Sequence, residues 1–160
     1  MAENESAASE QEKQFVIQKI YTKDVSFESP RSPEVFRDEN WKPDANVQVE
    51  TAAHSLGNNS HEVVLTVTVT VKSGDSTAYL VEVQQAGIFG IQGFNDEEMG
   101  HMFGSYCPNL LFPYVREVVS DLATKGGFPH MVLQPINFDA LYAKHLQRQK
   151  QQQENAAETH

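Results

Sequence analysis

The strongest constraint on the fold lies in residues 61–72, "HEVVLTVTVTVK". Its apolar and Thr residues alternate, which predicts a half-buried β-strand because successive side chains of a strand point to opposite faces. The apolar face consists of Val63, Leu65, Val67, Val69 and Val71, and the other face of Thr66, Thr68 and Thr70. Further strands are predicted in "FVIQKIYTKDVSFE", "ANVQVETAAHSL" and "TAYLVEVQQAGIF". The tight turns at "GNNS" and "SGDS" favour antiparallel pairing, so we expect a sheet of about four strands.

The first of these strands alternates less regularly. Lys19 and Lys23 interrupt its apolar face, which is typical of a β-bulge or of an edge strand. The residues of one parity, predicted to share a face, are Phe15, Ile17, Tyr21, Val25 and Phe27.

The second half of the chain has helical patterns. Asn95 or Asp96 is a predicted N-cap, Pro113 predicts a kink or restart, and Gly126 or Gly127 ends the helix that precedes Pro129. A last helix is predicted to begin at Asn137, with one apolar stripe made of Phe138, Leu141, Tyr142, His145 and Leu146. Residues 1–13 and 150–160 are polar and predicted to be disordered tails around one domain at 14–149.

The charge balance restricts the partners. Lys and Arg number 12 against 22 Asp and Glu, a formal net charge of −10 that argues against nucleic acid and favours a basic protein surface. We find neither a secretory-signal pattern nor an apolar run long enough for a bilayer, so we expect a cytoplasmic protein without membrane insertion.

Catalytic and cofactor motifs are not recognised. The six His residues lack metal-ligand spacing, and "GIFGIQG" lacks the residues of a phosphate loop, so we expect no metal and no cofactor. Cys107 has two interpretations: a nucleophile activated at a helix N-terminus, or a small buried apolar residue among Phe, Leu and Tyr. Without a partner base in the sequence, packing is preferred.

Two strand faces and one loop suggest binding surfaces. If the strands align, Asp24 and Glu28 join Leu80 and Glu82 in an acidic patch, which either docks a basic partner or is an ordinary solvated face. The opposite parity, which includes Val81, Val83 and Gln85, serves either subunit association or core packing. Trp41, in a Pro-rich connection, is either a functional aromatic residue or a plug for the core.

Four segments together resemble the SecB family of bacterial protein-export chaperones: "IYTKDVSFE", "EVQQAGIFGIQG", "YCPNLLFPYVREVVSDLATKGGFP" and "PINFDALYAKHLQRQ". The resemblance covers roughly residues 14–149. It implies an α+β protomer, with a four-stranded antiparallel sheet and two main helices packed on one face, that assembles as a homotetrameric dimer of dimers. It also implies a non-enzymatic holdase that uses no nucleotide, keeps precursor polypeptides unfolded and passes them to SecA, the translocase ATPase.

The resemblance also implies residue roles. The SecA-binding positions correspond to Asp24, Glu28, Leu80 and Glu82, and positions at or near the subunit interface to Val81, Val83 and Gln85. The client grooves of the family are lined by a long loop, a strand and the last helix, which here offer Trp41, Val47, Val49, Phe138, Leu141 and Tyr142. Two alternatives stay open: an adaptor that binds only folded partners, and a small enzyme that uses Cys107 and a histidine.

Overall fold

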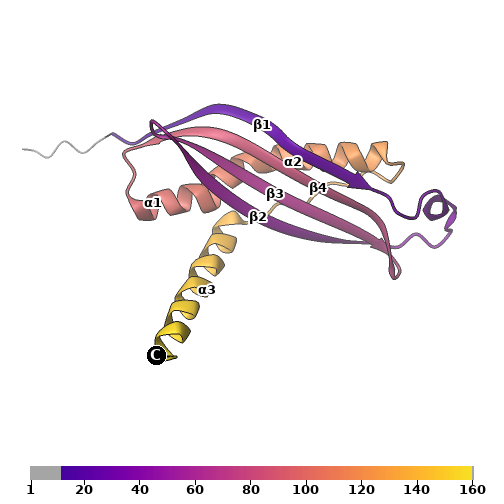
Figure 1. The fold of residues 1–160 in the computed structure, drawn as a ribbon. Coiled ribbons are helices and arrows are strands. Elements are labelled where there is room, and N and C mark those ends of the chain that lie inside the picture. Colours follow the sequence, from indigo (N-terminus) through magenta and orange to yellow (C-terminus); the bar gives the residue numbers. More distant parts are fainter. Residues whose placement is uncertain (1–11, 160) are drawn as a thin grey trace, which may run out of the picture.

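The computed structural model describes residues 12–159, so most of the predicted N-terminal tail lies outside the described residues. Four strands form one antiparallel sheet in the order β1-β4-β3-β2, as predicted (Figure 1). The two edge strands are therefore β1 and β2. The strands are β1 (Gln14–Glu28), β2 (Pro43–Gly57), β3 (Ser60–Ser73) and β4 (Ser76–Gln92), and a short 3₁₀ helix, η1 (Glu34–Arg37), interrupts the β1–β2 connection.

The alternation of β3 separates the two faces of the sheet. Its odd-numbered side chains, from Val63 to Val71, are at most 2% exposed, whereas the Thr side chains alternate with them on the other face. We call the buried side the inner face and the Thr-bearing side the outer face. The tight β2–β3 turn rests on Asn58 (φ 51°) and Asn59 (φ 60°), a left-handed pair that suits a two-residue hairpin.

Strand β1 carries two irregularities in its pairing with β4, between Ile17 and Lys19 and between Thr22 and Asp24. Each extra residue reverses the alternation of the side chains. The prediction that Tyr21 shares the face of Ile17 and Val25 is therefore wrong: Tyr21 pairs with Ala86 and lies on the outer face. The expected bulge and the expected edge position are both confirmed.

The helical half is continuous from residue 96 to residue 125: α1 (Asp96–His101), the π-helical η2 (Met102–Tyr106) and α2 (Cys107–Lys125). Asn95 caps α1 in a capping box with Glu98. Of the kink or restart predicted at Pro113, the restart does not occur, since α2 runs through this residue. Gly127 (φ 88°) ends α2 in a Schellman motif, in which the Phe128 N–H donates to the Ala123 carbonyl at 3.0 Å.

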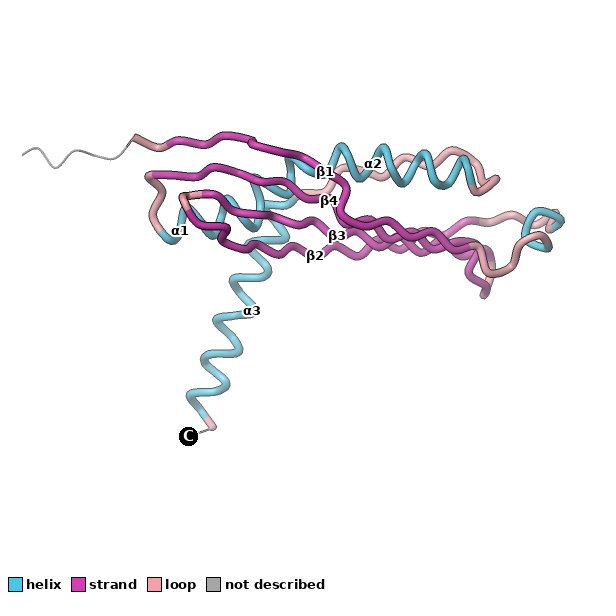
Figure 2. Tube along the Cα trace, turned by 45° about the horizontal axis from the view of Figure 1, so that its top comes forward, coloured by secondary structure: helices cyan, strands magenta, loops and turns pink. Residues whose placement is uncertain are grey.

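Helix α2 packs on the inner face against β3 and β4, with Leu111, Val115 and Val119 fully buried. The last helix, α3 (Phe138–Glu158), contacts the body mainly through η2 and then projects away from it (Figures 1 and 2). The sequence predicts disorder from residue 150, whereas the structure continues α3 to Glu158. Gln, Glu, Lys, Arg and Ala are good helix formers, which accounts for a helix without packing. None of the described helices is long and apolar enough to cross a membrane.

Candidate functional site: two grooves and an acidic face

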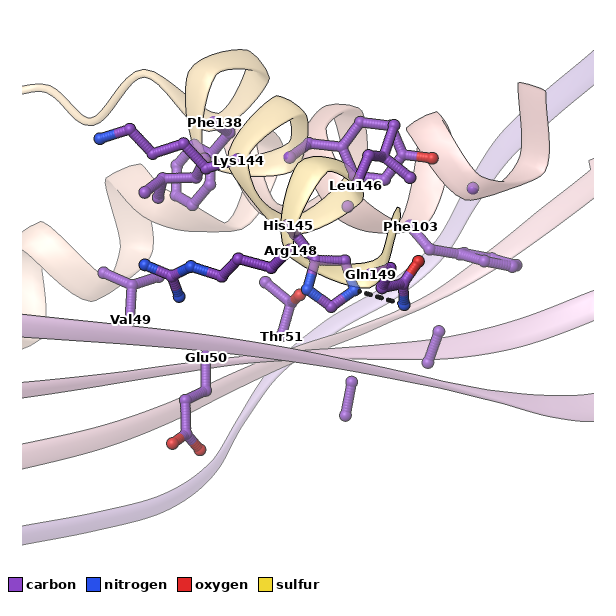
Figure 3. A pocket seen from close by; sticks show the side chains of 16 residues that line it. Val49, Glu50, Thr51, Phe103, Phe138, Lys144, His145, Leu146, Arg148 and Gln149 are labelled. Atoms are coloured by element: carbon purple, nitrogen blue, oxygen red, sulfur yellow. Dashed lines mark hydrogen bonds between the residues drawn. The ribbon is translucent and has the colours of Figure 1, made fainter. Parts of the chain in front are cut away.

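A groove lies between the inner face of edge strand β2 and helix α3 (Figure 3). Its volume is about 660 Å³. We call it the α3 groove; its apolar lining includes Val49, Ala53, Phe103, Phe138, Leu141 and Leu146. Since β2 is an edge strand, no strand among the described residues pairs with its outer edge beside the groove.

Two glycines set the position of α3. A Cβ added at Gly100 would lie 2.5 Å from the Tyr142 hydroxyl oxygen, and one at Gly104 would collide with the Tyr142 ring, 2.9 Å from Cε2. The ring of Tyr142 therefore fills the space that any larger residue at these positions would need. This close approach brings the first turns of α3 against α1 and η2.

A cluster of polar side chains also anchors the first turns of α3. Asp139 accepts a hydrogen bond from Ser105 and lies 2.9 Å from Nε2 of His101. These contacts, first the one with Ser105 and then the one with His101, lower the pKa of the Asp139 carboxyl. The Asn137 side chain caps α3 by accepting from the Ala140 N–H at 3.0 Å.

A second groove continues along the same face of β2. Ala45 and Val47 form one wall, and the segment 131–136, which leads into α3, forms the other. Its volume is about 350 Å³, and Gln134 is its one polar lining residue. We call it the linker groove. Together the two grooves follow β2 from Ala45 to Ala53.

The outer face carries the predicted acidic patch. The β1–β4 register pairs Glu28 with Leu80, Ser26 with Glu82 and Asp24 with Gln84, so the four predicted residues Asp24, Glu28, Leu80 and Glu82 lie on one face. Lys23, at the bulge beside these residues, forms an ion pair with Glu62, in which Nζ lies 2.9 Å from Oε1. Glu62 also accepts a hydrogen bond from Tyr21; burial and this carboxylate raise the pKa of Tyr21 to about 12.

A comparison with known families identifies the chain. The family model described as preprotein translocase subunit SecB matches residues 8–149. The chain belongs to the SecB family. Relatives named protein-export protein SecB are similar over nearly their whole length: that of Nitrosococcus oceani is 57% identical, with 92% of this chain and 90% of the relative covered. That of Alcanivorax borkumensis is 58% identical, with 94% and 95% covered.

The fold has a solved counterpart. A SecB-like chaperone of Mycobacterium tuberculosis, solved in complex with a ChAD peptide from an antitoxin, superposes with a TM-score of 0.65 at 17% identity. The match covers 76% of this chain and 90% of that one. SecB proteins are chaperones rather than enzymes, and membership of this family gives the chain a chaperone role in protein export.

The structure distributes the client-binding residues predicted from the SecB resemblance over three places. Val49, Phe138, Leu141 and Tyr142 line the α3 groove. Val47 lines the linker groove, and Trp41 lines neither groove. Instead Trp41 packs against the core and stacks on Phe128, with ring centroids 5.8 Å apart.

Sequence reasoning missed several lining residues. Gly100, Phe103 and Gly104 come from the helix before α2, and the linker groove uses the irregular segment 131–136. The spacing of Gly100 and Gly104, four apart in a predicted helix, was the available signal, because small residues at this spacing permit a close helix crossing. The segment 131–136 has no periodicity from which its contact with β2 could be read.

The residues predicted at or near the subunit interface lie in the core of the protomer. Val81 and Val83 are fully buried, and Gln85 is 2% exposed and accepts a hydrogen bond from Thr22 at 3.0 Å. These three side chains are therefore not available for direct contact with a partner chain, and they could affect assembly only through the helices that cover the inner face. We call α1, η2 and α2 the helical layer. Its large exposed apolar residues among those described are Tyr106 (43% exposed) and Tyr114 (44%), with half-buried Leu110 between them.

Cys107 is buried in the same core. Desolvation raises the pKa of its thiol to about 12, so the reactive thiolate is not formed at neutral pH. This supports the packing interpretation. Among residues 12–159, no cluster of three or more His, Cys, Asp or Glu is placed to hold a metal ion.

Proposed function

We propose that this chain is an ATP-independent holdase that binds unfolded precursor polypeptides in the α3 and linker grooves and delivers them to SecA through the acidic outer face. The observation that carries the proposal is the arrangement around the sheet. The apolar grooves lie on the inner face along the open edge of β2, whereas Asp24, Glu28 and Glu82 lie on the outer face. Client and translocase would therefore contact different faces of one sheet, so both could be bound at once.

The energetics suit clients of many sequences. Each apolar side chain that leaves water contributes about 1.5–3 kcal/mol before ordering costs. Several such anchors, spread over two adjoining grooves, offset the entropy lost by an unfolded segment. No single side chain is then required. Folded proteins bury their apolar anchors and would not compete for the grooves. Binding would then be restricted to chains that are still unfolded in the cytoplasm before export.

We further propose that the protein acts as a homotetramer, a dimer of dimers. The stripe of Tyr106, Leu110 and Tyr114 leaves apolar surface of the helical layer without cover in the single chain. Such a surface is typical of subunit contacts, where aromatic residues are enriched. Val81, Val83 and Gln85 would then act on assembly indirectly, by supporting α2.

The test is the aggregation of a chemically denatured precursor, followed by light scattering after dilution with and without the protein and without ATP. The expected result is suppression at a near-stoichiometric amount of tetramer. Unchanged scattering would contradict the holdase and favour an adaptor that binds folded partners alone. A variant with Val47→Asp and Leu141→Asp, which places one charge in each groove, should lose the suppression.

A further inference from the structure

Lys23 adjoins the acidic patch of the outer face without neutralising it. It directly precedes Asp24 and is the extra residue at the second irregularity of β1. An extra residue interrupts the alternation of a strand, so two neighbouring side chains can point to the same face. They do so here: Asp24 lies on the outer face, and Lys23 contacts Glu62, which alternates with buried Val63 and therefore also belongs to the outer face.

The ion pair with Glu62 directs Lys23 away from the patch. Strand β4 pairs with both β1 and β3 and gives their residues a common position along the sheet. Asp24 is level with residue 84 and Glu28 with residue 80, whereas Glu62 is level with residue 88. Glu62 therefore lies on the side of Asp24 that is remote from Glu28. Among residues 12–159, no ion pair gives Asp24, Glu28 or Glu82 a cation.

Glu62 is a fixed and ionised partner for Lys23. Its side chain is 14% exposed, against 45% for that of Lys23. The Tyr21 hydroxyl group donates a hydrogen bond to the same carboxylate. These contacts, first the one with Tyr21 and then the one with Lys23, lower the pKa of the Glu62 carboxyl. The carboxylate is thus charged at neutral pH and has one place, which restricts the flexible Lys23 side chain.

We propose that Glu62 is a positioning residue for the docking of SecA: by holding Lys23, it keeps the carboxylates of the acidic patch free for a basic partner. The inference rests on the proposed docking of SecA and adds a residue to the four predicted from the resemblance. Without the charge of Glu62, the long Lys23 side chain would turn to the adjacent Asp24. A cation of the protein itself would then compete with those of the partner and weaken the negative potential of the patch.

The experiment measures the affinity of the intact chain for purified SecA by titration calorimetry at low salt. Glu62→Gln keeps the shape of the side chain and should weaken binding about threefold to tenfold. Lys23→Gln alone should stay within about twofold of the unchanged protein, since Lys23 is already held away from the patch. Glu62→Gln with Lys23→Gln should restore the affinity, because no cation remains beside Asp24. Added salt should reduce the loss in Glu62→Gln.

Lys19 provides the matched control for net charge. It is exposed and pairs with Ile88, so it lies on the outer face as well. Glu62→Gln with Lys19→Gln has the same net charge as the restored variant but keeps Lys23, and its affinity should remain low. Thermal unfolding separates a structural effect: Glu62→Gln should have the same stability with and without Lys23→Gln, while the two affinities for SecA differ.

Three results would overturn the inference. The first is an unchanged affinity for SecA in Glu62→Gln, or a loss that Lys23→Gln does not restore. The second is equal restoration by Lys19→Gln, which would assign the effect to net charge. The third is a gain in Lys23→Gln alone as large as the loss in Glu62→Gln, which would show that Lys23 already neutralises the patch. Binding of SecA by the unchanged protein would leave the proposed function intact in all three cases, whereas its absence would contradict both.

Discussion

The Tyr142 ring on α3 lies where a side chain at Gly104 would have to be: a Cβ there would come within 2.9 Å of Cε2 and closer still to Cδ2. The same ring approaches Gly100 through its hydroxyl group. One aromatic residue thus fixes the crossing of α3 over α1 and η2, and with it the width of the α3 groove.

Gly104→Ala is expected to displace α3 and to weaken client binding. Alanine favours a helix over glycine by about 1 kcal/mol, so propensity alone predicts a more stable protein. The collision with Tyr142 acts in the opposite direction. We expect lower thermal stability or faster amide exchange in residues 138–146, together with weaker suppression of precursor aggregation. Adding Tyr142→Ala should relieve the collision, so the effects of the two changes should not be additive. Additive effects would show that the ring does not set the crossing.

Asp139→Asn should loosen α3. The pKa of Asp139 is lowered in the folded protein, so its stabilising contribution is complete above the ordinary pKa of 3.8 and is lost as the pH falls through the lower, folded value. The carboxylate therefore holds Ser105 and His101 throughout the neutral range. Amide exchange at neutral pH should become faster in the first turns of α3. Asp121→Asn, which removes the exposed pair with Lys125, should leave these turns unchanged. Equal protection in both variants would exclude the anchoring role.

Glu82→Lys is expected to abolish SecA docking while client binding persists, because the change lies on the outer face and the grooves on the inner face. Reversal of a charge in a complementary interface costs several kcal/mol, which corresponds to more than about a hundredfold in affinity. Titration calorimetry with SecA measures the loss. Glu97→Lys, an equal charge change on exposed α1, is the control. Unchanged SecA affinity in the Glu82 variant would remove the patch assignment.

Val83→Asn should shift tetramers toward dimers and also destabilise the fold. A buried amide without partners costs about 1–3 kcal/mol, and Val83 is fully buried below the helical layer. Tyr114→Ser, on the exposed surface, should weaken assembly with little loss of protomer stability. Sedimentation velocity and urea unfolding over a range of protein concentrations separate the two effects. Intact tetramers in both variants would contradict the assembly proposal.

Cys107 should resist alkylation in the folded protein. With a pKa of about 12, the thiol stays protonated at neutral pH, and its burial excludes the reagent. Labelling should become fast only after denaturation, and Cys107→Ala should still suppress aggregation. Rapid labelling of native protein, or loss of function in the Ala variant, would restore the nucleophile interpretation.

Local sequence patterns determined much of the secondary structure of this protein. The alternation from Val63 to Val71 predicted a half-buried strand, and the structure confirms it. Asn95 caps the beginning of α1 and Gly127 ends α2, each being one of the two residues expected there, because a cap depends on the residue and its immediate neighbours. Asp24 and Glu28 keep a common face because both follow the second irregularity of β1, so their spacing in the sequence was sufficient.

Only the tertiary structure decided which surfaces meet. Tyr21 lies on the outer face because the pairing with β4 sets where the bulges fall; the interruptions at Lys19 and Lys23 indicated a bulge or an edge strand but not the face of Tyr21. Val83 is covered by the helical layer of the same protomer. The parity of a strand shows which residues share a face, but not whether that face packs in the core or against another subunit. The α3 groove arises where Tyr142 meets Gly100 and Gly104, two glycines about forty residues before it in the sequence, and where α3 comes to lie over β2. Side-chain periodicity specifies the face of an element, whereas packing between distant segments specifies what that face contacts.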